Sequence, residues 1–217
     1  MLDLLSEYGD VFLDGLITTV EVSSLGILLG CLLGLVLAAG LSSSMGVVSG
    51  FCRAYRSAVR GTPILVQLLM IFYVPTKFGF KIDPYVVAVI GLGFNSAAFQ
   101  AEIFRAAALS VPHGQREAAA MVGIANAQVW WHITLPQVMR LSLPPLVSEL
   151  GILLKNSSLL SIISVTELMR RGQQIVSASY QPLETFMILA IIYIGLNLVL
   201  ARVGKLLERR LAVSGKE

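Results

Sequence analysis

The sequence predicts an all-α polytopic membrane protein: a single transmembrane domain, residues 1–217, with five membrane-spanning helices. Two observations predict this class. Hydrophobic residues make up 56% of the chain and charged residues only 13%, whereas about a quarter of the residues in a soluble globular domain are charged. Charge-free stretches also occur, the longest from Val22 to Cys52. This composition excludes an ordinary cytosolic enzyme, a disordered chain and a secreted disulfide-rich scaffold.

The expected spans follow from the length that a helix needs to cross a bilayer, about 20 mostly apolar residues. The apolar stretches of sufficient length predict spans at 13–39, 60–78, 84–107, 138–165 and 183–205. No basic segment precedes the first apolar run, which is too long for a signal peptide, so we expect a retained helix there.

The orientation follows from the distribution of Lys and Arg, which favour cytoplasmic loops. With the N-terminus outside, the inner segments hold eleven Lys and Arg residues and the outer loops hold four. The first Lys or Arg is Arg53. We therefore expect the N-terminus outside and the C-terminus in the cytoplasm.

The first span carries Gly26, Gly30 and Gly34 at intervals of four residues. Small residues at this spacing form a groove where another helix backbone can approach closely. Packing within the subunit is the favoured interpretation, and a contact between subunits is the alternative. The second span follows Gly61-Thr62-Pro63, where Thr62 is expected to cap a helix and Pro63 to begin it.

The third span carries Asn95 and Glu102, which are seven residues apart and so lie on one helical face. Polar side chains at membrane depth are costly unless they face protein or water. We expect this face to look into the bundle or a cavity. Glu102 and Arg105, three residues apart, are expected to form a local ion pair.

The fourth span carries Glu149 and Lys155, and Pro144-Pro145 is expected to kink a helix or begin one. A separation of six residues places the two charges about 240° apart on a helix, so they do not pair with each other. Either they form buried ion pairs with other helices or they line a polar pathway. For Lys155 a structural role beside Asn156 is favoured.

The loop at 108–137 is punctuated by Gly and Pro and is expected to lie in the cytoplasm. We expect two short helices, 115–122 and 126–133, joined at Gly123. Such a projecting pair is suited to docking a cytoplasmic partner. The alternative is an interfacial helix on the lipid with Trp130 and Trp131 at the headgroups.

This loop carries a spaced motif. It reads Glu117-Ala118-Ala119, three residues, Gly123, nine residues, and Ile133-Thr134-Leu135-Pro136. The pattern resembles the EAA motif of binding-protein-dependent ABC importer permeases. The resemblance implies that 108–137 is the coupling loop, seated in a cleft of an ATP-hydrolysing subunit. It gives the coupling role to seven residues: Glu117, Ala118, Ala119, Gly123, Ile133, Leu135 and Pro136. Glu117 would anchor the loop and Gly123 would permit its turn.

Further segments, among them RGTPILVQ at 60–67 and LLKNSSLLSIISVTELMRRGQQI at 153–175, resemble the polar amino acid permeases. This resemblance implies a type I ABC importer fold, multi-pass in a bacterial cytoplasmic (inner) membrane and in contact with its lipid. The implied partners are two ABC ATPase subunits, an identical or related second permease subunit, an extracytoplasmic solute-binding protein and the amino acid substrate.

The chain is expected to be a transporter subunit and not an enzyme, with no nucleic acid partner. It has no GxxxxGK[ST] phosphate-binding loop, so no nucleotide is expected on this chain, and no cofactor or metal either. The resemblance implies that ATP and magnesium bind to the partner ATPases. Glu149, Asn95 and Lys155 are the candidate residues of the substrate pathway. A channel or scaffold that works without ATP is the alternative function.

Overall fold

The structure is a computed structural model that describes residues 2–213, and every regular element within them is helical. Lys216, one of the expected inner cations, lies outside this described part. In chain order the α-helices are α1 (Leu2–Leu41), α2 (Gly46–Gly61), α3 (Ile64–Lys77), α4 (Pro84–Ser110), α5 (His113–Met121), α6 (Asn126–Val129), α7 (Leu135–Asn156), α8 (Leu168–Ser179) and α9 (Pro182–Val213). A π-helical segment, Trp130–Thr134, joins α6 to α7, and a 3₁₀ segment, Ser157–Ile163, follows α7.

Four of these helical stretches are long and apolar enough to cross a membrane. They are Asp3–Leu41, Pro84–Ser110, Asn126–Ile163 and Pro182–Arg210. The α2–α3 pair makes a fifth if its two bent helices form one broken span. The all-α membrane class is therefore confirmed, with four continuous candidate spans and one bent pair.

The expected single helix over 60–78 is not formed. α2 and α3 meet at 106°, and α3 alone has 14 residues, about 21 Å of helix. Pro63 occupies the N-cap position of α3 and does not begin the helix as predicted. The break is local, because proline supplies no backbone N–H and disfavours a helical conformation in the residue before it.

The fourth expected span also differs from its prediction. α7 begins at Leu135 and passes through Pro144 and Pro145 without ending. Beyond Asn156 the chain tightens into the 3₁₀ segment, which ends at Ile163 and is followed by Ser164 with a φ of +67°. Residues 138–165 are thus an α-helix followed by a tighter turn, and the two prolines do not start it.

The glycine stripe of α1 packs against α4 within the same chain. A Cβ on Gly34 would lie 2.9 Å from Cβ of Gln100, and one on Gly30 would lie 2.6 Å from Nε2 of the same residue. Only glycine leaves room for so close an approach. The intrasubunit packing prediction is confirmed, and the alternative subunit contact is wrong for this stripe.

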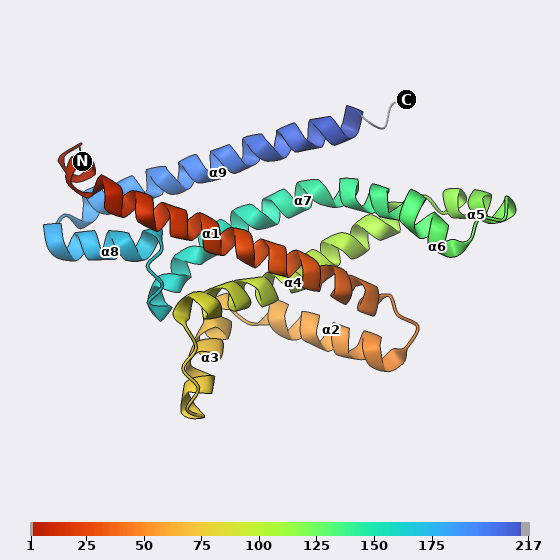
Figure 1. The fold of residues 1–217 in the computed structure, drawn as a ribbon, viewed down its shortest axis with the longest axis horizontal. Coiled ribbons are helices and arrows are strands. Elements are labelled where there is room, and N and C mark those ends of the chain that lie inside the picture. The colour runs from red at the N-terminus through yellow and green to blue at the C-terminus, as the bar shows by residue number, and fades with distance from the viewer. Residues whose placement is uncertain (1, 214–217) are drawn as a thin grey trace.

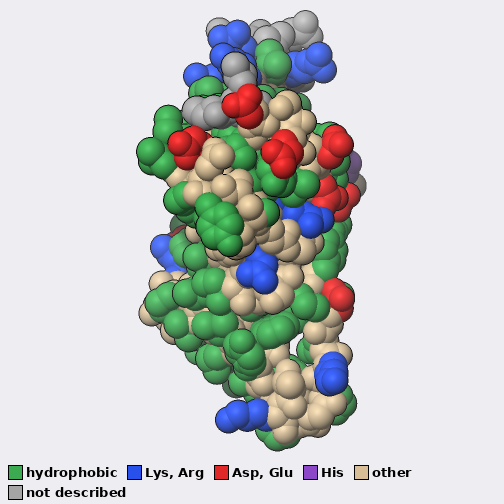
Figure 2. All heavy atoms as spheres, turned by 90° about the vertical axis from the view of Figure 1, so that its left-hand side faces the viewer, with side chains coloured by type: hydrophobic (Ala, Val, Ile, Leu, Met, Phe, Trp, Pro, Cys, Tyr) green, Lys and Arg blue, Asp and Glu red, His purple; other side chains and the backbone are tan. Residues whose placement is uncertain are grey.

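The helices form an elongated bundle in which α1, α4 and α7 run along its length (Figure 1). The beginning of α1 and helix α8 lie at one end, and α5 and α6 project at the other (Figure 1). Figure 2 shows acidic side chains gathered at the first of these ends. Asp3, Glu7 and Asp10 are exposed there.

Three apolar clusters hold the bundle. The central one includes Val22, Leu68, Leu92 and Leu153, from α1, α3, α4 and α7. Another lies where α1, α8 and α9 meet and includes Phe12, Leu168 and Leu189. The last lies at the α5–α6 end, around Phe104, Val111 and Val138. These clusters fix the helices that position the site residues below.

Candidate functional site

The loop at 108–137 turns at Gly123, as predicted. Gly123 has a φ of +76°, a conformation that glycine adopts without steric cost. Its N–H donates to the Ala120 carbonyl at 3.1 Å, and the Ile124 N–H donates to the Ala119 carbonyl at 3.0 Å. These bonds close the end of α5 by the same means that commonly terminates helices.

The second short helix differs from its prediction over 126–133. α6 ends at Val129, and the π-helical segment carries the chain directly into α7. Thr134 in this segment is buried, and Pro136 lies in the first turn of α7, where its missing N–H needs no partner. The loop is therefore rigidly continuous with a long helix of the bundle.

A groove of about 710 Å³ lies between α5 and the start of α7. Its walls include four of the motif residues: Ala118, Ala119, Ile133 and Pro136. Gln137 Nε2 donates to Gln115 Oε1 at 2.7 Å and so joins α7 to α5. The small side chains of the motif thus line one concave surface together.

The remaining motif residues lie elsewhere. Glu117 is exposed on α5, and Gly123 forms the turn. Leu135 faces a different pocket, between α7 and the ends of α1 and α4. Of the seven expected residues, four thus line the groove, Gly123 forms the turn, Glu117 is exposed, and Leu135 is half-buried against the second pocket.

Glu149 is buried between α7 and α4, with 6% of its surface exposed. Ser96 of α4 donates a hydrogen bond to Glu149 Oε1 at 3.0 Å. Ser96 Oγ accepts in turn from Gln100 Nε2 at 2.9 Å. The hydrogen-bond partner of this carboxylate is a hydroxyl on a neighbouring helix and not a cation.

A cavity of about 460 Å³ opens beside Glu149, between α4 and α7. Arg60 of α2 and Glu102 of α4 also line it. Arg60 lies over the ring of Phe99, with Cζ 5.3 Å from the ring centroid, a favourable cation–π distance. The cavity therefore brings two carboxylates and a guanidinium together in a lining that is otherwise mostly apolar.

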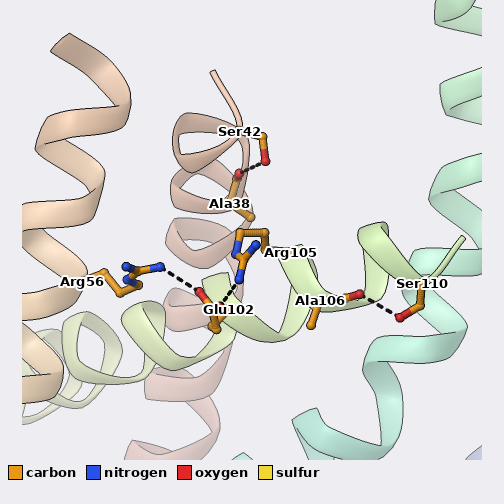
Figure 3. Close-up of polar contacts among 7 residues, drawn as sticks. All are labelled: Ala38, Ser42, Arg56, Glu102, Arg105, Ala106 and Ser110. Atoms are coloured by element: carbon orange, nitrogen blue, oxygen red, sulfur yellow. Dashed lines mark hydrogen bonds and ion pairs between the residues drawn. The ribbon is translucent and has the colours of Figure 1, made fainter. Parts of the chain in front are cut away.

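The expected pair of Glu102 and Arg105 is present, and the structure adds a second arginine (Figure 3). Arg56 Nη1 lies 3.1 Å from Glu102 Oε2. Arg56 comes from α2, 46 residues earlier in the chain. One carboxylate thus binds two guanidinium groups and ties α2 to α4.

Asn95 does not line the cavity beside Glu149 and Glu102. It is buried, and its Nδ2 donates to Gln67 Oε1 at 3.1 Å. Gln67 Nε2 donates to the Val59 carbonyl at 2.8 Å and to Thr62 Oγ1 at 2.8 Å. Asn95 therefore supports the break between α2 and α3 through Gln67, a residue that sequence reasoning did not single out.

Lys155 and Glu149 line different cavities. Lys155 is exposed and borders a groove of about 380 Å³ between α7 and α9, with Tyr193 and Asn197. This divergence agrees with the angular separation expected from their spacing.

Glu167 is a buried carboxyl that sequence reasoning missed. It accepts hydrogen bonds from the Met169 and Arg170 N–H groups, both at 2.8 Å, and so caps α8. The Tyr193 hydroxyl also donates to it, at 3.2 Å. Burial outweighs these bonds and raises the pKa of Glu167 to about 7. The sequence feature that could have predicted this role is the position of Glu167 directly before a helix, where an acidic side chain can cap the backbone N–H groups.

α8 is also tied to α1. The Leu168 N–H donates to Thr19 Oγ1 at 3.1 Å, and Arg171 pairs with Asp14.

Among the described residues, no group of three His, Cys, Asp or Glu side chains is placed to hold a metal ion.

Comparison with known proteins gives a family and close relatives. The family described as "Binding-protein-dependent transport system inner membrane component" matches residues 26–213. The arginine transport system permease protein ArtQ of Bacillus subtilis is 35% identical over 200 residues, which cover 92% of this chain and 91% of ArtQ. The glutamine transport system permease protein GlnP of Escherichia coli is 34% identical over 207 residues, 94% of each chain.

Solved structures agree with these sequence matches. A chain from a crystal structure of an amino acid ABC transporter with histidines has a TM-score of 0.90 and 35% identity, covering 95% of this chain and 96% of that one. A chain of the MetNI methionine ABC transporter in an inward-facing conformation has a TM-score of 0.81 at 18% identity, covering 94% and 98%. The second match supports the fold alone.

Proposed function

This chain belongs to the binding-protein-dependent transport system inner membrane components, and from that premise we propose that it is the permease subunit of an ATP-driven importer of polar amino acids. The family is one of transporter subunits, and ATP hydrolysis resides in separate subunits. Its relatives include permease proteins of arginine, L-cystine and glutamine transport systems, so a polar amino acid is the substrate class that we assign.

The observation that carries the proposal is the groove between α5 and α7. Its small motif side chains leave space for a partner, and Gln137 and Gln115 hold its walls together. The π-helical segment joins the loop to α7, so movement of a docked ATPase would be passed to the bundle. In this proposal Glu117 anchors the ATPase and Gly123 sets the turn.

The substrate pathway would run beside Glu149. This buried carboxylate can attract the ammonium group of an amino acid, while Arg60 across the same cavity can attract its carboxylate. Lys155, in its separate groove, and Asn95, behind Gln67, would act on the pathway from outside this cavity. The helices would rock between inward and outward access as the ATPases close.

The expected orientation of the chain in the membrane assigns a partner to each end of the bundle. With the N-terminus outside, the end bearing α8 meets the solute-binding protein, and the end bearing α5 and α6 meets the ATPases in the cytoplasm. Two ATPase subunits carrying ATP and magnesium would pair with two permease subunits, either identical or related.

The test is co-purification from mild detergent, followed by coupled ATPase assay. The tagged chain should recover an ATP-binding subunit, and Glu117→Ala should reduce both recovery and transport while membrane insertion stays intact. Glu7→Gln, an exposed change at the opposite end of the bundle, is the matched control. Recovery of the chain alone, under conditions that preserve a known importer complex, would instead favour an ATP-independent channel or scaffold.

A further inference from the structure

An apolar pocket, separate from the motif groove, shares no lining residue with it. It has a volume of about 310 Å³ and is enclosed by the last turns of α1 and α4 and the start of α7. Leu35, Phe104, Leu135 and Val138 contribute to its walls. Pockets that hold small molecules have volumes of about 300–1,000 Å³, so this one has room for a ligand of modest size.

The pocket has one charged residue among its described lining residues, Arg105, and no carboxylate. The side chain of Arg105 is 34% exposed. Its Nε is buried without a hydrogen-bond partner among the described residues. An apolar pocket with a single guanidinium matches an amphiphile with an apolar tail and an anionic head.

The local charges strengthen this match. Glu102 is shared between Arg56 and Arg105, so two positive groups meet one negative group (Figure 3). Of these three groups only Arg105 lines the pocket, near the ends of two helices long and apolar enough to cross a membrane. A negatively charged group there would balance it.

The surroundings of the pocket identify the source of the amphiphile. Leu109, which lines the pocket, is 64% exposed, and Trp130, which also lines it, is 43% exposed. Tryptophan and exposed apolar side chains near the ends of spanning helices are typical of the boundary between headgroups and acyl chains. The pocket therefore lies where a phospholipid from the adjoining leaflet can reach it.

We propose that this pocket binds an acyl chain of an anionic phospholipid from the cytoplasmic leaflet, with Arg105 facing its phosphate. The assignment of the leaflet rests on the orientation in the proposed function. Because Trp130 begins the π-helical segment and Leu135 begins α7, the bound lipid packs against the junction that carries the coupling loop and stabilises it.

The experiment is native mass spectrometry of the full chain, with any partner subunits, released from nanodiscs of phosphatidylglycerol and phosphatidylcholine. Ala39 is exposed and lines the pocket, so Ala39→Phe fills the pocket without burying a new group in the core. The matched control is Ala190→Phe, at an exposed position on α9. Arg105→Gln tests the headgroup contact.

The expected result is phosphatidylglycerol retained by the wild type and by Ala190→Phe, and lost from Ala39→Phe. Arg105→Gln should reduce the preference for phosphatidylglycerol over phosphatidylcholine about tenfold, the effect of one charge-assisted hydrogen bond. Unchanged retention in Ala39→Phe would overturn the proposal. So would retention of a free fatty acid, or of a second copy of the chain, that Ala39→Phe alone removes.

Lipid retention is measured without transport, so its failure is distinguishable from failure of the importer assignment. A chain that retains phosphatidylglycerol in the pocket but recovers no ATPase would overturn the proposed function while supporting the lipid site. A chain that couples to an ATPase but retains no lipid would do the reverse.

Discussion

Ser96 of α4 and Glu149 of α7 form a hydrogen bond of 3.0 Å between two helices that line the same cavity. The bond orients the carboxylate while leaving it beside a space that also contains Arg60 and Glu102. The hydroxyl donor brings no positive charge to this carboxyl group. Glu149 therefore remains able to attract a positively charged group.

Glu149→Gln should weaken transport while preserving the fold. The amide keeps the size of the side chain and can still accept from Ser96, but it loses the charge that would bind an ammonium group. Removing one charge-assisted hydrogen bond costs about 1.5–3 kcal/mol, or about 10–150-fold in apparent affinity. Transport assayed in proteoliposomes against substrate concentration measures this change. Ser96→Ala is the companion variant, and wild-type kinetics in Glu149→Gln would remove Glu149 from the pathway.

Gly123→Ala should impair coupling because its backbone φ is +76°. An L-residue in this left-handed conformation costs about 1–2 kcal/mol. The expected outcome is reduced substrate-stimulated ATPase activity, with partial recovery in Gly123→Asn, since asparagine tolerates this conformation. Gly114→Ala is the control in the same loop, because no positive φ is required there and nothing lies within 4 Å of its added Cβ. Equal activity in both alanine variants would contradict the role of the turn.

Gly34→Ala should destabilise the bundle. Its Cβ would lie 2.9 Å from Cβ of Gln100 and 3.2 Å from the backbone nitrogen of Ala101. Forcing α1 away from α4 is expected to lower the free energy of unfolding by about 1–3 kcal/mol. Thermal unfolding in detergent, compared with Gly195→Ala on the open surface of α9, measures the effect. A Gly34→Ala melting temperature equal to that of the control would show that α1 and α4 are not packed so closely.

Lowering the pH from 8 to 5 should stabilise the end of the bundle bearing α8. The pKa of Glu167 is about 7 in the folded chain, against 4.5 for an unperturbed carboxyl. The stabilisation of the folded state is therefore fully present below pH 4.5 and is lost as the pH rises through 7. The difference in pKa corresponds to a change on the order of 3 kcal/mol.

Melting temperatures at pH 5 and pH 8 measure this dependence on Glu167. Glu167→Gln, which can still accept a hydrogen bond from the start of α8, should flatten it. Glu7→Gln, at an exposed position on α1, should leave it unchanged. A dependence that persists in Glu167→Gln would assign the titration to another group.

Much of the coupling loop was predictable because its signals are local. The spacing from Glu117 to Pro136 indicated a folded loop, and the glycine at 123 marked its turn. The stripe at Gly26, Gly30 and Gly34 likewise predicted close helix packing from its periodicity. These features depend on residues within a few turns of one another, so a single sequence carries them.

The α2–α3 region was harder to predict because its support comes from distant residues. Arg56 lies between the first two expected spans, and it pairs with Glu102, 46 residues away. Gln67 and Asn95 hold the break from two different helices. Counting charge-free stretches placed the arginines of α2 in a loop. The reason is that a charged helix whose ion-pair partners lie far along the chain cannot be recognised from its neighbouring residues.

Because of the π-helical segment, the number of residues in the motif determines how α5 is oriented relative to α7. Its i→i+5 bonds hold one more residue than an α-helical turn would, between the turn at Gly123 and the start of α7 at Leu135. Each residue of helix rotates what precedes it by about 100° and shifts it by about 1.5 Å. Deleting one of Trp130, Trp131 and His132 would keep every motif side chain but shorten the interval between Gly123 and Ile133 from nine residues to eight. It would nevertheless turn α5 to face a different side of the bundle. The nine residues between Gly123 and Ile133 therefore set the direction in which α5 and its groove face relative to α7.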